Sequence, residues 1–203
     1  MTSIITGDII HSQKASPTIW LNKLKSELNA LGRNPETWEI YRGDSFQVEI
    51  TDPSLALLTS IKIKAAIKCI KHIDVRLAIG IGDKTYQATN ITESNGSAFV
   101  NSGDIFESLV KKKQNLAIST PSVEFNKEMN LLFRLALIAM DNWTINSAEM
   151  IHLTLSNPGY SQKELGKMLG IKQNAVSNRL KRAYYDEISE LIKRYQNKIK
   201  EIT

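Results

Sequence analysis

The segment SQKELGKMLGIKQNAVSNRLKR, residues 161–182, constrains the fold more than any other part of the chain. Ser161 and Glu164 have the spacing of a capping box, in which each residue satisfies a backbone N–H group at the start of a helix. Gly170 predicts the end of that helix, because glycine adopts positive φ at little cost. A second helix is expected to follow, with Val176 and Leu180 on its inner side. The segment therefore predicts two short helices joined by a tight turn.

This pattern resembles the helix-turn-helix units of repressors and sigma factors, whose second helix enters the major groove of DNA. Glutamine, asparagine and arginine can contact base edges, and lysine and serine suit phosphates. The residues expected to contact double-stranded DNA are Lys172, Gln173, Asn174, Ser177, Asn178, Arg179, Lys181 and Arg182. Replacing Arg179 with alanine is expected to weaken binding by about 1–3 kcal/mol. The alternative is a plain helical hairpin with a solvated polar face.

Basic charge is concentrated in the same part of the chain. Residues 159–203 hold 10 Lys+Arg and 5 Asp+Glu, a net of +5, whereas residues 1–158 hold 16 of each and have no net charge. A basic surface on one segment is the electrostatic footprint of a polyanionic partner. We therefore expect residues 146–203 to form an all-α helix-turn-helix DNA-binding domain.

The chain before this domain alternates strand-like and helix-like segments. Strands are expected at 3–10, 38–50 (a hairpin turning at Gly43-Asp44), 74–82 and 115–120, and helices are expected to begin near Ser16, Asp52 and Gly96. This order predicts an α+β domain over residues 1–120, with helices packed on one face of an antiparallel or mixed sheet. Residues 121–145 are expected to form a connecting helix. The lysines of the helix that starts near Asp52 are expected to form a solvated face: Lys62, Lys64, Lys68 and Lys71.

Composition limits the class of protein. The longest apolar run, Leu131–Met140, is interrupted by Arg134 and is too short to span a bilayer. The N-terminus lacks the pattern of a secretory signal. The single cysteine, Cys69, excludes an internal disulfide. We therefore expect a cytoplasmic protein with no membrane partner.

Two aspartates, Asp8 and Asp44, are expected at the ends of strands that can be neighbours. A pair of carboxylates at one end of a sheet can hold Mg²⁺ together with the phosphates of a substrate. The alternative is that Asp44 is a hairpin-turn residue and that Asp8 simply ends a strand or caps a helix. The spacing alone leaves both possibilities open.

Four segments in order resemble the SatD family of small bacterial proteins: TGDII, RGDSFQ, DVRLAIGIG and GSAFVNSGDIFESL. The core of that family is in turn similar to the catalytic domain of class III nucleotide cyclases and of GGDEF diguanylate cyclases. This resemblance implies a ferredoxin-like or cyclase-like sheet over about residues 3–110. It also implies that Asp8 and Asp44 are metal ligands and that Asn101 orients the ribose of a bound nucleotide.

Two positions depart from the cyclase pattern. Ile105 stands where cyclases carry an arginine that stabilises the transferring phosphate, and Ile40 stands where many of them read a purine base. Losing such charge stabilisation typically costs orders of magnitude in rate. The first domain is therefore expected to act as a nucleotide or metal sensor, or as an interaction module, more readily than as an efficient cyclase.

Together these patterns predict a transcriptional regulator that binds DNA as a homodimer. The first domain would supply dimerisation or a ligand input, because cyclase-like domains pair and helix-turn-helix proteins commonly read two half-sites. The alternative is a Mg²⁺-dependent enzyme of the class III cyclase type, which binds or cyclises nucleotides.

Overall fold

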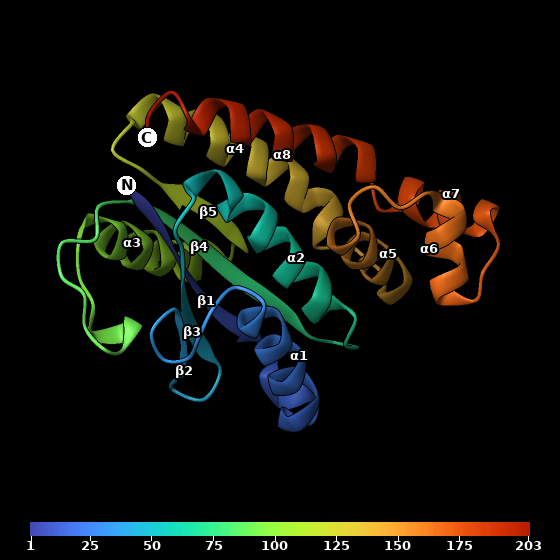
Figure 1. Ribbon diagram of the computed structural model, residues 1–203, viewed down its shortest axis with the longest axis horizontal. Helices are drawn as coiled ribbons and strands as arrows, with labels where there is room; N and C mark the ends of the chain where they lie inside the picture. The colour runs from blue at the N-terminus through green and yellow to red at the C-terminus, as the bar shows by residue number, and fades with distance from the viewer.

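The computed structural model describes residues 1–203 and contains a five-stranded mixed sheet with eight α-helices (Figure 1). The strands are β1 (Thr2–Ile10), β2 (Trp38–Tyr41), β3 (Ser45–Ile50), β4 (Asp74–Gly82) and β5 (Leu116–Ser119). Their order is β2-β3-β1-β4-β5, and all neighbours are antiparallel except β4 and β5. The α+β class expected from the sequence is confirmed.

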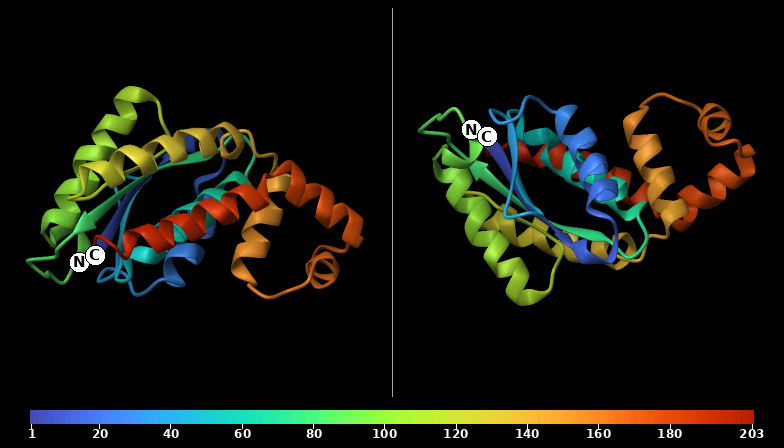
Figure 2. Two further views of the ribbon diagram at one scale, coloured as in Figure 1. Left: turned by 90° about the horizontal axis from the view of Figure 1, so that it is seen from above. Right: turned by 90° about the horizontal axis from the view of Figure 1, so that it is seen from below.

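Eight helices pack on the sheet or extend beyond it. They are α1 (Pro17–Asn29), α2 (Ala56–Lys68), α3 (Ser97–Lys112), α4 (Val123–Met140), α5 (Ile145–Ser156), α6 (Gln162–Leu169), α7 (Gln173–Arg182) and α8 (Tyr185–Ile199). Helices α2, α4 and α8 lie along the sheet. Helix α5 packs against α2 at one end of this layered body and adds Ala148 and Ile151 to its core, and α6 and α7 extend beyond it (Figure 2). None of the helices combines the length and apolarity needed to cross a membrane.

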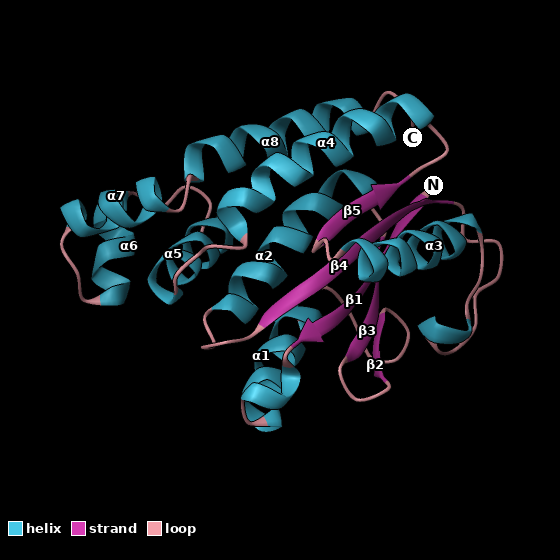
Figure 3. Cartoon of the chain, turned by 180° about the vertical axis from the view of Figure 1, so that it is seen from behind, coloured by secondary structure: helices cyan, strands magenta, loops and turns pink.

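The expectation that the helices cover only one face of the sheet is wrong. Helices α1, α2, α4 and α8 share a core of 35 buried residues with one face, whereas α3 covers the opposite face (Figure 3). The alternation of β4 explains both layers, because successive side chains of a strand point to opposite faces. The residues of β4 that point to the main core are large: Val75, Leu77, Ile79 and Ile81. The residues that face α3 are small: Ala78, Gly80 and Gly82. A Cβ atom at Gly80 would lie 2.3 Å from the backbone of α3.

Helix α4 closes the outer edge of β5 with two asparagine side chains. Asn130 accepts from the N–H of Ile118 at 2.9 Å and donates to its carbonyl at 2.8 Å. Asn126 makes the same pair of bonds with Thr120, at 2.9 and 2.8 Å. These amides satisfy backbone groups that would otherwise be open to another strand. The sheet therefore ends at β5.

The last helix returns to the layered body. Tyr195 of α8 is fully buried, its hydroxyl donates to the carbonyl of Pro53 at 2.8 Å, and burial raises the pKa of this phenol. Ile188, Ile192 and Ile199 belong to the same core as the sheet. Although α8 falls within the predicted 146–203 domain, its apolar face is thus buried against residues of the first domain. The domain boundaries at residues 120 and 145 stay a prediction.

The expectation of a solvated lysine face on α2 is wrong at Lys64, which is buried, and at Lys68, whose side chain is 10% exposed. The Lys64 side chain is 1% exposed, and its Nζ lies 2.8 Å from Asp74 and 2.7 Å from Asp141. Lys68 also contacts Asp74, at 3.0 Å. Because α2 lies between the sheet and other helices, a lysine in its middle keeps its charge only with carboxylates beside it.

Replacing Lys64 with alanine is expected to lower the free energy of unfolding by about 2 kcal/mol or more, because Asp74 and Asp141 lose a buried counter-charge. The loss should stay below the ~3–5 kcal/mol of a fully buried pair, since Lys68 remains beside Asp74. Urea unfolding followed by circular dichroism measures the change. Lys62→Ala on the same helix is the control and should stay within ~0.5 kcal/mol of the parent. Equal losses in the two variants would contradict the buried network.

Candidate nucleic-acid interface and carboxylate site

Helix α6 begins and ends at the residues that the sequence predicts, and the expected second helix, α7, follows it. The Oγ of Ser161 accepts from the N–H of Glu164 at 3.3 Å, and the Glu164 carboxylate accepts from the N–H of Ser161 at 2.7 Å. Hydrogen bonds from Ser161 lower the pKa of Glu164. Gly170 ends α6 at φ 66°. The predicted capping box and the left-handed glycine at the end of α6 are therefore both confirmed.

The buried side of α7 determines which of its residues face solvent. Val176 and Leu180 pack with Met150 and Leu165 in a small core between α5, α6 and α7. A residue on the far side of the helix then recurs at i, i+3, i+4 and i+7. The residues at those positions are all exposed: Asn174, Ser177, Asn178 and Lys181. We name these four residues the outer stripe of α7.

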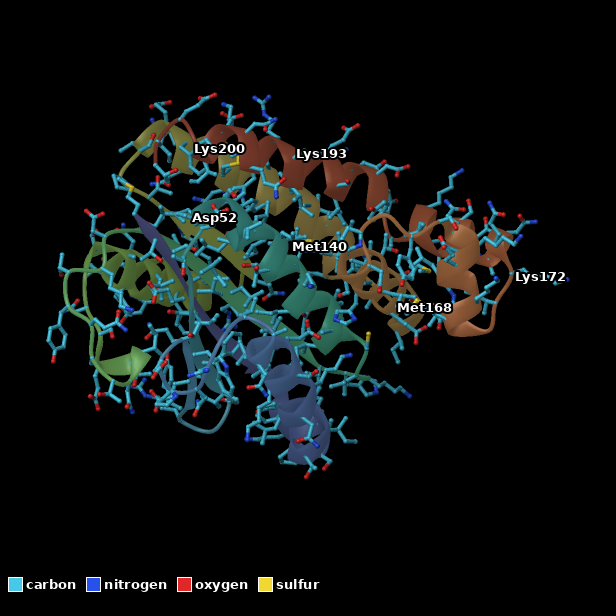
Figure 4. The ribbon with its side chains drawn as sticks, in the orientation of Figure 1. Asp52, Met140, Met168, Lys172, Lys193 and Lys200 are labelled. Carbon is cyan, nitrogen blue, oxygen red and sulfur yellow. The ribbon has the colours of Figure 1, made fainter.

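The outer stripe lies at the end of the molecule farthest from the sheet. In Figure 1 α7 occupies that end, and in Figure 4 the side chain of Lys172, just before α7, points away from the body. The segment that carries the stripe also holds the charge. Residues 159–184 contain six Lys+Arg and one Asp+Glu, a net of +5, whereas residues 185–203 contain four of each. The positive excess of the chain is thus confined to α6, α7 and their connections.

Arg179 differs from the other predicted DNA contacts. Its Nη1 lies 3.0 Å from Oε2 of Glu149 in α5, and its side chain is only 23% exposed. This ion pair holds Arg179 on the flank of α7, away from the outer stripe. The remaining predicted contacts are exposed: Lys172, Gln173, Asn174, Ser177, Asn178, Lys181 and Arg182.

The structure brings Asp8 and Asp44 together. Asp8 pairs with Ser45 in the register of β1 and β3, and the N–H of Ile9 donates to the carbonyl of Asp44 at 3.1 Å. Both aspartates line a cavity of about 360 Å³ at the end of β1. The Oγ of Ser12, in the same wall, donates to Oδ2 of Asp44 at 2.8 Å. We name this space the aspartate cavity.

Arg76 completes the aspartate cavity and was not predicted from the sequence. Its Nη1 donates to both carboxylate oxygens of Asp8, at 3.1 and 3.3 Å. Burial raises the pKa of Asp8, the positive charge of Arg76 lowers it, and the negative charge of Asp44 raises it, with a net upward shift. The available signal was an arginine inside the otherwise apolar segment that follows Asp74. The register of β1 and β4, in which Arg76 faces Asp8, was needed to interpret it.

Asn101, the predicted ribose contact, is not part of this cavity. Its Nδ2 donates to the carbonyl of Ile81 at 2.7 Å, near the other end of β4. Ile81 lies five residues beyond Arg76 in that strand, which corresponds to roughly 16 Å at the rise of a β-strand. The residues implied by the cyclase resemblance are therefore divided between two ends of the sheet.

The donor set of the aspartate cavity suits Mg²⁺ in part. This ion is commonly held by one or two carboxylates together with phosphate oxygens. Asp8 and Asp44 supply the two carboxylates, but both oxygens of Asp8 already accept from Arg76. No group of three or more His, Cys, Asp or Glu side chains is arranged to hold a metal. The two carboxylates would therefore hold Mg²⁺ only together with a phosphate ligand that brings the remaining oxygens.

Comparisons of the chain with protein-family models, with curated proteins and with solved structures found no match. The resemblance to the SatD family and to nucleotide cyclases stays a prediction. The geometry and chemistry of the two sites described above are therefore the basis for inferring function.

Replacing Asp44 with asparagine is expected to lower the pKa of Asp8, because the negative charge of Asp44 disfavours ionisation of its neighbour. The raised pKa also makes Asp8 stabilise the fold at low pH, and this contribution is lost as pH rises through the folded-state pKa. In Asp44→Asn the loss should be smaller. Carbon-13 NMR titration of the aspartate carboxyls measures the pKa. Asp52→Asn is the control, and an Asp8 pKa that does not differ between the two variants would contradict the proximity.

Proposed function

We propose that this protein is a DNA-binding transcriptional regulator in which α6 and α7 form a helix-turn-helix unit. The observation that carries the proposal is the outer stripe of α7, which is polar, exposed and located in the segment that holds the positive excess of the chain. In helix-turn-helix proteins the second helix lies in the major groove with its exposed side chains on base edges. Helix α7 has that place in the pair and nothing from the chain packs over its outer stripe.

The residues of the unit divide by chemistry into two roles. Asn174 and Asn178 can form paired hydrogen bonds to adenine, and they are the expected base-reading residues. Lys172, Lys181 and Arg182 are expected to contact phosphates and to make affinity depend on salt. Gln173 and Ser177 lie between these groups on the same exposed surface. Arg179 instead positions α7 against α5 through its ion pair with Glu149.

The proposed regulator acts as a homodimer that forms through the outer face of α4 and the start of α8. Leu131, Leu135 and Ile138 recur on α4 at i, i+4 and i+7 and are 49, 56 and 69% exposed. Leu135 and Ile138 line, together with Tyr184, an apolar groove of about 420 Å³ between the two helices. Large exposed apolar patches on soluble proteins commonly mark contact surfaces.

Charge favours a second copy of the chain as the occupant of this face. Arg134 on α4 is exposed outside the groove and Glu187 on α8 lines it, and neither has an ion-pair partner within the chain. In a two-fold dimer the same surface meets itself, so each arginine can face the glutamate of the other copy. A two-fold arrangement also supplies two α7 helices for two half-sites.

Replacing Asn174 or Asn178 with alanine is expected to weaken specific DNA binding by about 1–3 kcal/mol each, because each asparagine supplies a base contact. Sites would first be recovered by sequencing genomic fragments retained by the protein, and affinities measured by fluorescence anisotropy at fixed salt. Lys193→Ala, an exposed lysine on α8 (Figure 4), is the matched control and should keep the parent affinity.

The role of Arg179 is separated from base reading by a stability measurement. Arg179→Ala is expected to lower the thermal midpoint because Glu149 loses its partner, whereas Asn178→Ala should leave it unchanged. Two outcomes would contradict the assignment of α7 as the helix that contacts bases. The unmodified protein would show no sequence preference, or both asparagine variants would keep full DNA affinity.

Ile138→Lys is expected to weaken self-association at least tenfold, roughly the effect of losing a central interface residue. Sedimentation equilibrium over a range of concentrations measures the dissociation constant. Ile19→Lys, at a residue of α1 that is 57% exposed, is the control with the same chemical change. A parent protein that stays monomeric, or an Ile138→Lys variant that stays dimeric, would contradict the proposed interface.

The aspartate cavity supports a second candidate function, binding or cyclisation of nucleotides with Mg²⁺. Calorimetry with Mg²⁺ and each ribonucleoside triphosphate, followed by an assay for cyclic products, tests it. Binding or turnover that requires Mg²⁺ and disappears in Asp44→Asn would support this function. Ile105, at the position of the cyclase arginine, packs beside Ala78 and Leu109, and it offers no charge to a transferring phosphate.

A further inference from the structure

A second and larger cavity lies beside the aspartate cavity, where the layered body meets α5. Its volume is about 630 Å³, and its walls come from the ends of β1 and β4, the segments that follow α2 and α3, and the connection between α4 and α5. The two cavities share Ile10, His11 and Arg76 in their walls. We name this second space the junction cavity.

The acidic groups in the wall of the junction cavity are already neutralised. Asp74 accepts from Lys64 at 2.8 Å and from Lys68 at 3.0 Å. Asp141 lies 2.7 Å from the same Lys64, and its carbonyl accepts from Lys68 at 2.8 Å. These two lysines and two aspartates therefore leave no uncompensated negative charge facing the cavity.

Several basic groups around the junction cavity remain available. Arg76 uses Nη1 for Asp8 and makes no hydrogen bond within the chain through Nη2, whereas its Nε is buried and out of reach of a ligand. Lys113 has no ion pair within the chain, and two imidazoles, those of His11 and His72, lie in the same wall. Arginine and lysine with unfilled donors are the groups that bind phosphate or carboxylate oxygens. The cavity is thus complementary to an anion.

Backbone conformation brings these basic residues to one place. Five non-glycine residues of the chain have positive φ, and three of them line the junction cavity: His11 at 61°, His72 at 66° and Lys113 at 51°. This conformation costs roughly 1–2 kcal/mol for a residue with a Cβ atom. Unfavourable backbone conformations tend to gather at ligand sites, where the surrounding structure holds them.

The junction cavity also touches the start of α5, close to the end of α7. Trp143 in its wall donates from Nε1 to the carbonyl of Ala183 at 3.0 Å, and Ala183 directly follows α7. Thr144, the next residue in the wall, caps the start of α5. A ligand in the cavity therefore touches the start of α5 directly and is linked to the end of α7 only through Trp143.

We propose that the junction cavity binds a phosphate-bearing small molecule of nucleotide size, and that this ligand sets the DNA affinity of α7 through Trp143. Arg76 and Lys113 bind the phosphate oxygens, and the side chains of Ile10, Ile70 and Ile145 offer an apolar wall to the remainder of the ligand. The first half of the proposal concerns binding alone. The second half rests on the proposed DNA-binding function.

Binding is tested by the fluorescence of Trp143 in a Trp20→Phe, Trp38→Phe background, since the chain holds three tryptophans. Inorganic pyrophosphate and ATP are titrated separately in EDTA, so that Mg²⁺ at the aspartate cavity does not contribute. Calorimetry on the unmodified chain gives the same affinities without relying on that background. We expect saturable binding of ATP, at least tenfold weaker in Lys113→Glu and unchanged in Lys111→Glu.

Lys111 is a matched control, because it is exposed near the end of the same helix but does not line the cavity. Binding of pyrophosphate with similar affinity would support a site for the phosphates alone, and tighter binding of ATP would support the contribution of the apolar wall. Absence of binding by both probes, or equal weakening in Lys111→Glu and Lys113→Glu, would overturn the assignment of the cavity.

The coupling is tested by measuring DNA affinity with and without saturating ATP in EDTA. We expect a change of at least fivefold, the lower end of typical coupling between sites. In Trp143→Phe, which cannot donate to Ala183, ATP should still bind but the change in DNA affinity should disappear. ATP binding with no effect on DNA affinity in the parent would overturn the coupling. Absence of DNA binding under all conditions would instead refute the proposed function and leave the ligand site standing.

Discussion

The hydrogen bond from Trp143 to the carbonyl of Ala183 fixes how the two parts of the chain meet. The chain leaves the layered body after α4 and returns to it at the start of α8, and this bond joins the two points. Helices α4 and α8 run side by side in opposite directions, as the contacts of Glu128 with Arg194 and Lys198 show. The segment from α5 to α7 is therefore held by α4 and α8 at its two ends, and by Ala148 and Ile151 of α5, which belong to the main core.

This arrangement places the outer stripe of α7 far from the layered body and the two cavities close to it. The outer stripe of α7 lies at the far end of the projecting segment, where the basic charge can meet a polyanion without interference from the acidic residues of the sheet. The aspartate and junction cavities lie at the near side, and they share Arg76. A rotation of the helices about Trp143 would move the outer stripe farther than the residues close to Trp143, because displacement grows with distance from the point of rotation.

Local patterns were predictable from the sequence, and contacts between distant segments were not. The capping box at Ser161 and the turn at Gly170 depend on neighbouring residues only, so both could be placed in advance. The side of the sheet that α3 covers depends on Ala78 and Gly80, which read simply as part of a buried strand. The burial of Lys64 depends on Asp141, far along the chain, and the role of Arg76 depends on the register with β1. The spacing of apolar residues identifies the buried side of a helix or strand, but it does not identify the residues that pack against that side.

The asparagines that bond to the outer backbone of β5 also limit how copies of this protein can assemble. Asn126 and Asn130 occupy the outward N–H and C=O groups of Ile118 and Thr120, so a further strand cannot pair with the outer edge of β5 at these residues. The opposite edge, β2, is four residues long, and Asn90 bonds to its Glu39 side chain. Neither edge is a good template for backbone pairing, which needs a long row of open groups. Assembly is thereby left to side chains on helices, which can form a closed pair, and the sheet is protected from open-ended growth into fibrils.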